Sequence, residues 1–188
     1  MSKVILGLTM SLDGYAEDIY GSVNPLYSDL ELLAETDMML DSIDTTGAVV
    51  MSFKEFNMAE DSDLYADHYE YQVPIFVFTD TVPEKHPREN DKLSFTFITN
   101  GIESAIKQAK GAAGEKDVNI IGSALTTPLC LRTKLIDELQ VDIIPRFLGE
   151  GYRPFENLGN LNIRLERIST EELPEGRIHI SYSIIPTS

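Results

Sequence analysis

A hydroxyl, a carboxylate and a glycine stand close together in Ser11-Leu12-Asp13-Gly14, directly after the apolar run from Val4 to Thr9. The Asp13 carboxylate could contact a hydroxyl group or a polar heterocycle, and Gly14 permits a tight turn of the backbone. An Asp-Gly pair on its own is more often an ordinary turn. The motif therefore indicates a binding loop only in the company of other motifs.

A second glycine motif lies near the C-terminus, where the apolar residues from Leu139 to Ile144 run into Pro145. The pattern Leu148-Gly149-x-Gly151-x-x-Pro154-Phe155 then turns the chain. Tyr152 and Arg153 lie inside this pattern. They could line a cleft that binds a small molecule.

A third motif is a turn between a strand-like run, Val118 to Ile121, and a helix-like segment. Such a turn can bind an anion, because the free N–H groups at the start of the helix donate hydrogen bonds to it. In this chain the turn consists of Gly122, Ser123 and Ala124. The Ser123 hydroxyl could cap the helix or bind a phosphate oxygen. Proline is favoured in the first turn of a helix, so Pro128 makes Thr127 an alternative cap. Alone, this turn is a weak signal.

Alternating strand-like and helix-like segments must position these motifs. Runs of apolar, β-branched and aromatic residues predict strands at 4–9, 47–51, 74–79, 93–99, 118–122, 139–144, 162–168 and 177–185. Helical spacing predicts helices at 26–39, 65–71, 100–111 and after 122, with Asn100 as the cap of the third. His179 alternates with isoleucines and is predicted to face solvent, and Ser, His and Asp show no spacing typical of a catalytic triad.

The order of these segments predicts an α/β fold. We expect a mixed, mainly parallel sheet of about eight strands, with helices on both faces and an antiparallel pair at the C-terminus. In sheets of this kind ligands bind beyond the carboxyl ends of the strands. The length of 188 residues fits a single domain, residues 1–188, and no repeat or linker interrupts it.

Composition excludes several classes of function. The net charge is −16, nearly all of it from residues 1–91, and no basic stripe suits a nucleic acid. No apolar run is long enough for a membrane helix. The only cysteine, Cys130, can form neither an internal disulfide nor a cysteine metal site, and the histidines are too scattered for a metal cluster. We therefore expect a cytoplasmic protein that binds a small molecule and no metal.

Stretches along nearly the whole chain carry a resemblance to a known family, and two of these motifs are among them. Asp137-Glu138-Leu139 opening a strand, followed by P-x-x-L-G-x-G-x-x-x-F, is similar to the C-terminal reductase domain of the riboflavin-biosynthesis deaminase-reductase (RibD). The Ser11-Leu12-Asp13-Gly14 loop resembles a hallmark of the same reductases, which share the dihydrofolate reductase fold. The resemblance implies a three-layer, dihydrofolate reductase-like domain that transfers a hydride from NADPH.

The resemblance also implies roles for individual residues. Ser11, Asp13 and Gly14 would flank the nicotinamide and the substrate, and Tyr152 and Arg153 would line the nicotinamide pocket. Dihydrofolate reductases carry an acid on the first helix that assists protonation of the substrate. Asp37 matches that acid by position, so the candidate catalytic residues are Asp13 and Asp37.

The cofactor motif departs from the family pattern. The strand end that usually reads G-R-x-T has Met51, Ser52 and Lys54 in place of the glycine, the arginine and the threonine. Lys54 retains one positive charge without the bidentate fork of an arginine.

Further candidates for binding the cofactor are Thr79 on the adenosine side and Gly122, Ser123 and Ala124 at the pyrophosphate. Ser123 replaces the second glycine of the family turn. The resemblance implies NADPH as the cofactor. Asp80 would repel the 2′-phosphate that distinguishes NADPH, so NADH is also possible.

Two main hypotheses follow. The first is an NADPH-dependent reductase of a small polar heterocycle, resembling 5-amino-6-(5-phosphoribosylamino)uracil reductase. The second is a binding or structural module on the same fold that has lost the cofactor chemistry. A strict folate reductase is a third, weaker reading. The resemblance also implies a homodimer through the sheet edge and the C-terminal strands, where apolar residues alternate at Ile178, Ile180, Tyr182 and Ile184.

Overall fold

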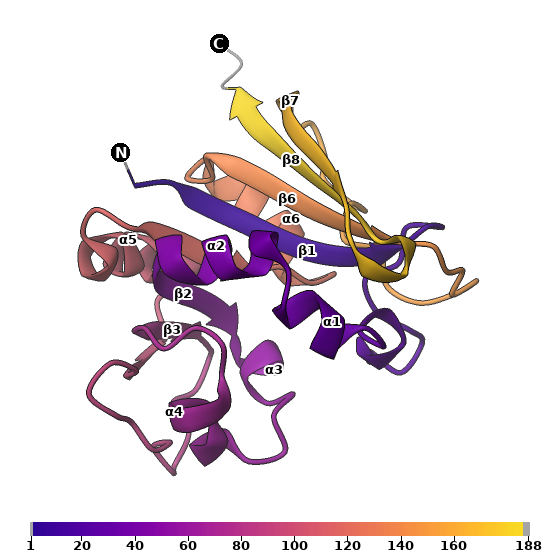
Figure 1. The fold of residues 1–188 in the computed structure, drawn as a ribbon. Helices are drawn as coiled ribbons and strands as arrows, with labels where there is room; N and C mark the ends of the chain where they lie inside the picture. Colours follow the sequence, from indigo (N-terminus) through magenta and orange to yellow (C-terminus); the bar gives the residue numbers. More distant parts are fainter. Residues whose placement is uncertain (1, 186–188) are drawn as a thin grey trace. The chain divides into compact units, whose positions relative to one another are not determined.

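The computed structural model describes residues 2–185, and the chain divides into two compact units (Figure 1). The first unit contains residues 43–121 together with the chain up to Val4. The second unit contains residues 5–42 and the chain from Gly122 onward. Each unit holds four of the eight strands of a mixed sheet.

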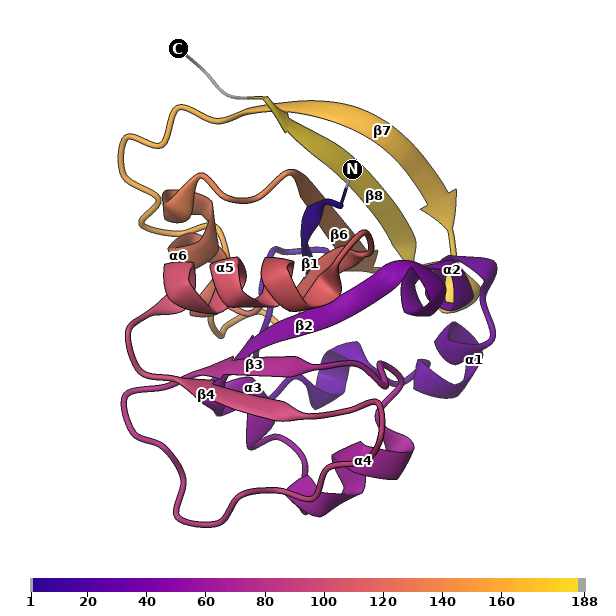
Figure 2. The ribbon, with the colours of Figure 1, turned by 90° about the vertical axis from the view of Figure 1, so that its left-hand side faces the viewer.

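The first unit is built on four parallel strands in the order β4-β3-β2-β5. Their bounds are β2 (Thr46–Ser52), β3 (Ile75–Phe78), β4 (Phe95–Ile98) and β5 (Asp117–Ile121). Helix α5 (Ile102–Ala113) packs along these strands (Figure 2) and buries one apolar face against them, with Ile106 fully buried. The short elements are α3 (Phe53–Phe56), η2 (Ser62–Leu64) and α4 (Tyr65–His68).

The second unit contains the strands in the order β1-β6-β8-β7. Strand β1 (Val4–Ser11) is parallel to β6 (Glu138–Ile144), and the next two pairs are antiparallel, formed with β8 (Ile178–Ile185) and β7 (Arg164–Glu172). The helices of this unit are η1 (Asn24–Leu26), α1 (Leu30–Ala34), α6 (Thr126–Thr133) and η3 (Pro174–Gly176). Helix α2 (Asp37–Thr45) belongs to the second unit at its start and to the first at its end.

The predicted fold class is confirmed: the chain has an α/β fold with eight strands, mostly parallel, and an antiparallel pair at the C-terminus. Cys130 is buried, as a core residue would be. Among the residues described, no helix is long and apolar enough to cross a membrane.

The single helix predicted for residues 26–39 is wrong. Three short helices, η1, α1 and α2, occupy this region and its continuation. The break comes at Thr36, whose hydroxyl donates to the carbonyl of Leu33 at 2.7 Å and accepts from the N–H of Met39 at 3.2 Å. A threonine that bonds the backbone in this way ends one helix and caps the next, which apolar spacing does not reveal.

Two local predictions are also wrong. Helix α5 is preceded by Gly101 at φ 92°, without a side-chain cap, so Asn100 is not the cap. His179 is only 5% exposed instead of facing solvent. Its position reflects a buried polar network in the second unit, described below.

Candidate functional site

The loop after β1 is organised by the hydroxyl of Ser11, which is fully buried. Its Oγ donates to Oδ1 of Asp13 at 2.6 Å and accepts from the N–H of Tyr15 at 3.0 Å. The backbone N–H of Gly14 donates to the Ser11 carbonyl at 2.9 Å, with Gly14 at φ 86°. A β-carbon at this positive φ would be strained, which explains the glycine. The predicted tight turn is present.

The Asp13 carboxylate links this loop to the glycine turn after β6. Besides the Ser11 hydroxyl, it accepts from the N–H of Leu148 at 3.1 Å and from the N–H of Gly149 at 2.8 Å. Desolvation would raise the pKa of Asp13, but the hydrogen bonds from Ser11, Gly149 and Leu148 together hold it below its ordinary value. At neutral pH the group is therefore a charged acceptor that fixes two loops to each other.

Arg153 also contacts the β1 loop at this junction. Its guanidinium donates to the Asp13 carbonyl at 2.8 Å and lies 4.0 Å from the centre of the Tyr15 ring, a cation–π contact. Tyr152 forms a short backbone bridge with Glu17, and its side chain is 53% exposed. The structure thus brings together all five predicted substrate residues, which are Ser11, Asp13, Gly14, Tyr152 and Arg153.

Large apolar side chains are exposed on these two loops. Leu12 and Phe147 are 57% and 72% exposed, and the Leu12 N–H bonds to the carbonyl of Arg146, next to Phe147. Together with Tyr152 they offer surfaces on which a flat ring can pack. Sequence reasoning missed Phe147, although an aromatic residue directly before a Leu-Gly turn was a usable signal.

The turn before α6 has little free space. The Gly122 N–H donates to the Gly7 carbonyl at 2.7 Å, and a β-carbon on Gly122 would lie 2.5 Å from that oxygen. The Ser123 side chain is buried and accepts from the N–H of Thr126 at 3.1 Å. The Ala124 N–H donates to Oε1 of Glu17 at 3.3 Å. Two of the N–H groups around this turn are therefore already bound by side chains.

Thr127 is not the cap of α6, because it is the second residue of the helix and follows Leu125 and Thr126. Its hydroxyl is fully buried and has no hydrogen-bond partner among the residues described. Thr127 Oγ1 would lie 3.1 Å from a β-carbon on Gly122, so the hydroxyl borders the turn. An unsatisfied buried hydroxyl at a turn is the kind of group that a polar ligand completes.

Two cofactor candidates lie in the first unit. Lys54 is exposed in α3, beside a capping box in which the buried Ser52 hydroxyl accepts from the N–H of Lys54 and Glu55. The Thr79 hydroxyl bonds the backbone of Thr81 at 2.9 and 3.2 Å. The basic side chains that follow lie beside acids: Lys85 beside Asp63, His86 beside Glu89, and Arg88 beside Asp67.

The remaining candidate, Asp37, is exposed at the first residue of α2. Among the residues described, it does not belong to the hydrogen-bonded group around Asp13. Its role rests only on its position in the sequence.

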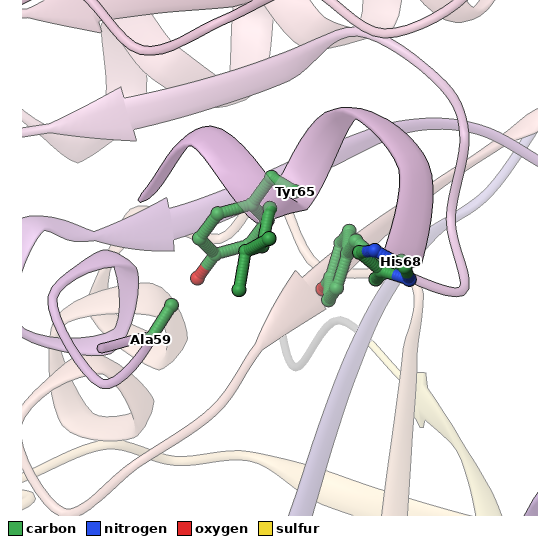
Figure 3. A pocket seen from close by; sticks show the side chains of 5 residues that line it. Ala59, Tyr65 and His68 are labelled. Atoms are coloured by element: carbon green, nitrogen blue, oxygen red, sulfur yellow. The ribbon is translucent and has the colours of Figure 1, made fainter. Parts of the chain in front are cut away.

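A small cavity of about 210 Å³ lies in the first unit (Figure 3), lined by Ala59, Leu64, Tyr65, His68 and Tyr69. Burial raises the pKa of Tyr65 to about 12. The Tyr65 hydroxyl donates to the Phe56 carbonyl at 3.1 Å, so it serves the fold. The cavity offers aromatic and apolar surface and was not predicted.

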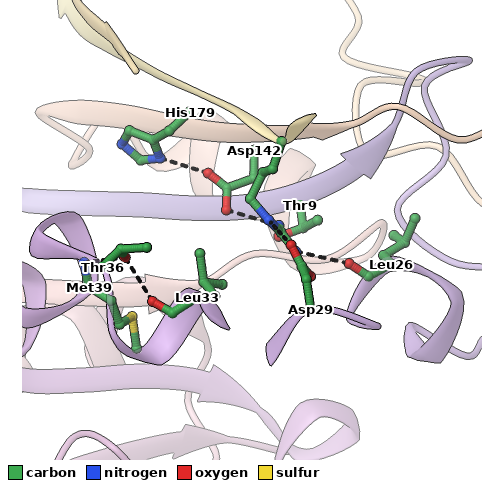
Figure 4. A network of polar contacts seen from close by, with 9 residues as sticks. Thr9, Leu26, Asp29, Leu33, Thr36, Met39, Asp142 and His179 are labelled. Carbon is green, nitrogen blue, oxygen red and sulfur yellow. Dashed lines mark hydrogen bonds and ion pairs between the residues drawn. The ribbon is translucent and has the colours of Figure 1, made fainter. Parts of the chain in front are cut away.

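A buried polar network in the second unit was missed entirely (Figure 4). Arg177 is fully buried and pairs with Asp29 at 2.5 Å and with Asp142 at 3.1 Å. Asp142 also bonds Nδ1 of His179 at 2.6 Å, and Nε2 of His179 lies 3.2 Å from the Ser181 hydroxyl. The contacts join residues far apart in the chain, and no spacing in the sequence announces them.

The order Ser181–His179–Asp142 resembles a catalytic triad, contrary to the expectation from spacing. His179 and Ser181 are each only 5% exposed, however, so a substrate does not reach them in this arrangement. Asp142 is engaged by Arg177 as well. We interpret the network as structural. Among the residues described, no three His, Cys, Asp or Glu side chains are grouped to hold a metal ion.

Comparisons with known proteins agree with this fold. The chain is 27% identical over 189 residues to the uncharacterized protein YyaP of Bacillus subtilis, covering 96% of this chain and 94% of that protein. A putative riboflavin biosynthesis protein from Shewanella sp. PV-4 matches with a TM-score of 0.76 at 22% identity, over 98% of this chain and 99% of that one.

A third match extends the fold likeness to folate enzymes. Dihydrofolate reductase from Enterococcus faecalis, complexed with NADP(H) and RAB-propyl, has a TM-score of 0.59 at 13% identity, over 97% of this chain and 96% of that one. These likenesses establish a dihydrofolate reductase-like fold. Residues 2–178 match the family model of the RibD C-terminal domain. The chain therefore belongs to the RibD C-terminal domain family.

Proposed function

We propose that the protein is a reductase that uses a nicotinamide dinucleotide to reduce a small, polar, heterocyclic substrate. The observation that carries the proposal is the junction around Asp13, in a chain of the RibD C-terminal domain family. The carboxylate fixes the β1 loop to the glycine turn, and the aromatic side chains of Phe147 and Tyr152 stand exposed beside it. This arrangement suits a flat ring with polar edges.

The residues of the α6 turn are the candidates for contacts with a phosphate group. Gly122 leaves no side chain between the turn and β1, and the buried hydroxyl of Thr127 lacks a partner among the residues described. The backbone of Ser123 and Ala124 and the Thr127 hydroxyl would hold the pyrophosphate. By family resemblance, Lys54 and Thr79 stay the candidates for the adenosine side. NADPH is the proposed cofactor, with NADH as the other possibility.

The chain's own part in the reaction is to bind, orient and exclude water. When bound, the dinucleotide supplies the hydride. The exposed rings of Phe147 and Tyr152 would pack on the substrate and keep solvent from the reacting carbon. Asp13, held as a carboxylate, would keep both loops in position and accept a hydrogen bond from a substrate edge. The family reaction that serves as reference is reduction of 5-amino-6-(5-phosphoribosylamino)uracil.

Calorimetric titration with NADPH and NADH tests the proposal directly. We expect saturable binding of at least one dinucleotide in the micromolar range, about −8 kcal/mol at 1 μM. The protein with bound dinucleotide should then oxidise it in the presence of a phosphoribosylated or free aminopyrimidine, which is followed by absorbance. A well-folded protein that binds neither dinucleotide would contradict the proposal.

Two features of the first unit favour a second possible function. Ser52 is buried in a capping box, and the loop side chains of Lys85, His86 and Arg88 each contact an acid. These features support a module that binds a ligand through the loops of the second unit without cofactor chemistry. Binding of an aminopyrimidine by a protein that ignores both dinucleotides would favour this alternative.

A further inference from the structure

The carboxylate of Glu17 stands where an anion would bind. Glu17 is only 1% exposed, and its Oε1 accepts the Ala124 N–H at 3.3 Å. Ala124 lies just before α6, an eight-residue helix without an acidic side chain in its first turn. The electropositive end of this helix therefore receives its negative partner from the β1 loop.

Glu17 is held at this position by its backbone. Its carbonyl accepts the N–H of Tyr152 at 2.9 Å, and the Tyr152 carbonyl accepts the N–H of Ala16 at 2.9 Å. Gly151, at φ 146°, packs so closely that a β-carbon would lie 2.1 Å from the Glu17 carbonyl. These contacts hold the backbone of the loop, so rotation of the Glu17 side chain would release the Ala124 N–H.

A phosphate at this turn would meet two obstacles. One donor, the Ala124 N–H, is already bound, and a buried negative charge lies beside it. Like charges in a site with little water repel more strongly than in solvent. The unpartnered hydroxyl of Thr127 borders the same turn and is a further group that a phosphate oxygen could satisfy.

We propose that Glu17 is an internal competitor for the anion site at the start of α6, and that it sets the affinity of this turn for a dinucleotide. The inference rests on the proposed function for the identity of the ligand, but not for the existence of the anion site. A bound pyrophosphate takes over the Ala124 N–H, and the Glu17 side chain turns away. The carboxylate thereby weakens binding and favours release.

The test compares the unmodified protein with Glu17→Gln and with a matched control, Glu150→Gln. Glutamine keeps the size of the side chain and an oxygen that can accept from Ala124, but it removes the charge. Glu150 is an exposed acid on the glycine turn, so its variant has the same net charge. Inorganic pyrophosphate, NADPH and NADH are titrated into each protein by calorimetry, after thermal unfolding confirms that each is folded.

We expect Glu17→Gln to bind these anions roughly tenfold more tightly and Glu150→Gln to change affinity by less than about twofold. In nitrogen-15 spectra, pyrophosphate should shift the Ala124 amide in the Glu17→Gln protein. Should glutamine prevent folding, Glu17→Asp shortens the side chain away from Ala124, and tighter binding is again the supporting result.

The outcomes separate the two proposals. If the unmodified protein binds a dinucleotide and Glu17→Gln binds it no more tightly, the competitor role is overturned and the reductase proposal stands. If Glu17→Gln gains affinity for pyrophosphate while neither protein binds a dinucleotide, the competitor role is supported and the reductase proposal is overturned. If no anion binds to any variant, both are overturned.

Discussion

The role of Asp13 depends on hydrogen-bond partners that lie close to it in the structure. Asp13 was predicted as a ligand-contacting acid from its place in the loop. The structure shows donors from Ser11, Leu148 and Gly149 on its two oxygens. Leu148 and Gly149 are more than a hundred residues away in sequence, so the sequence alone could name Asp13 but not its partners. Whether substrate also contacts Asp13 stays a prediction.

Arg177 should be among the residues most sensitive to substitution. Arg177→Met removes the cation between the buried Asp29 and the partly buried Asp142, and both carboxylates lose it. Breaking a buried ion pair on one side costs about 3–5 kcal/mol of unfolding free energy. Urea unfolding followed by circular dichroism measures the loss. The control Arg164→Met, at an exposed position of β7, should change stability by less than about 0.5 kcal/mol. Equal effects of the two variants would contradict this account.

The same network predicts acid sensitivity. Hydrogen bonding to Arg177 lowers the pKa of Asp29 below its ordinary value of 3.8. A carboxyl whose pKa is lower in the folded state stabilises the fold above its unfolded pKa, and the stabilisation is lost as pH falls through the folded pKa. We therefore expect the unfolding free energy to fall below about pH 4.

Asp29→Asn checks this assignment. The variant should be less stable than the unmodified protein at neutral pH, because Arg177 loses a charged partner. The difference between the two should shrink as the pH falls below about 4, because the Asp29 carboxyl of the unmodified protein is protonated first in the unfolded chain and then, at lower pH, in the folded one. Urea titrations at several pH values measure it. A difference that stays constant down to pH 3 would rule out Asp29 as the group that titrates.

Strands were predictable and short helices were not, for a physical reason. Each of the eight predicted strands overlaps a strand of the structure, because a buried strand needs a continuous apolar or alternating run. Helices of only a few residues carry too few turns to show a period. The boundary between α1 and α2 depends on one hydroxyl, that of Thr36, and the start of α5 depends on the positive φ of Gly101.

The candidate site was predictable to the level of its loops. The glycines marked both turns, and the family resemblance named the residues that the structure brings together. The position of Glu17 was not predictable, because contacts between distant loops set it. Glu17 is buried, and its carboxylate accepts the N–H of Ala124, more than a hundred residues away in the sequence.

Gly151 should be the most demanding position of the glycine turn. In Gly151→Ala the new β-carbon would lie 2.1 Å from the Glu17 carbonyl, at a φ of 146° that alanine rarely adopts. We expect a loss of about 1–3 kcal/mol of unfolding free energy. Gly149→Ala is the matched control, because φ is also positive, at 79°, but no atom lies within 4 Å. Its loss should be smaller, about 1 kcal/mol. Thermal unfolding of both variants measures the two losses. A larger loss of stability in Gly149→Ala than in Gly151→Ala would contradict the packing argument.

The whole molecule presents an apolar surface on its C-terminal strands that supports self-association. On β8, His179 and Ser181 are buried, whereas the alternating apolar residues remain only partly buried: Ile178, Ile180, Tyr182 and Ile184. Leu165 on β7 pairs with Ile184 and is 41% exposed. Strand β7 is also the last strand of the second unit, so its outer edge has no partner strand within the described sheet. An apolar strip beside an open edge is typical of a protein interface.

We therefore predict a homodimer through β7 and β8, detectable by gel filtration with light scattering. The net charge of −16 opposes association, so the dimer should strengthen with added salt, which screens repulsion over about 10 Å at 0.1 M. Leu165→Glu should give a folded monomer, because the side chain is exposed in the single chain. Leu32→Glu, at an equally exposed position on α1, should leave the dimer intact. A monomer at micromolar concentration and high salt would contradict the prediction. Dissociation by Leu32→Glu alone would place the interface on α1, because it would show that the strip on β7 and β8 stays in solvent.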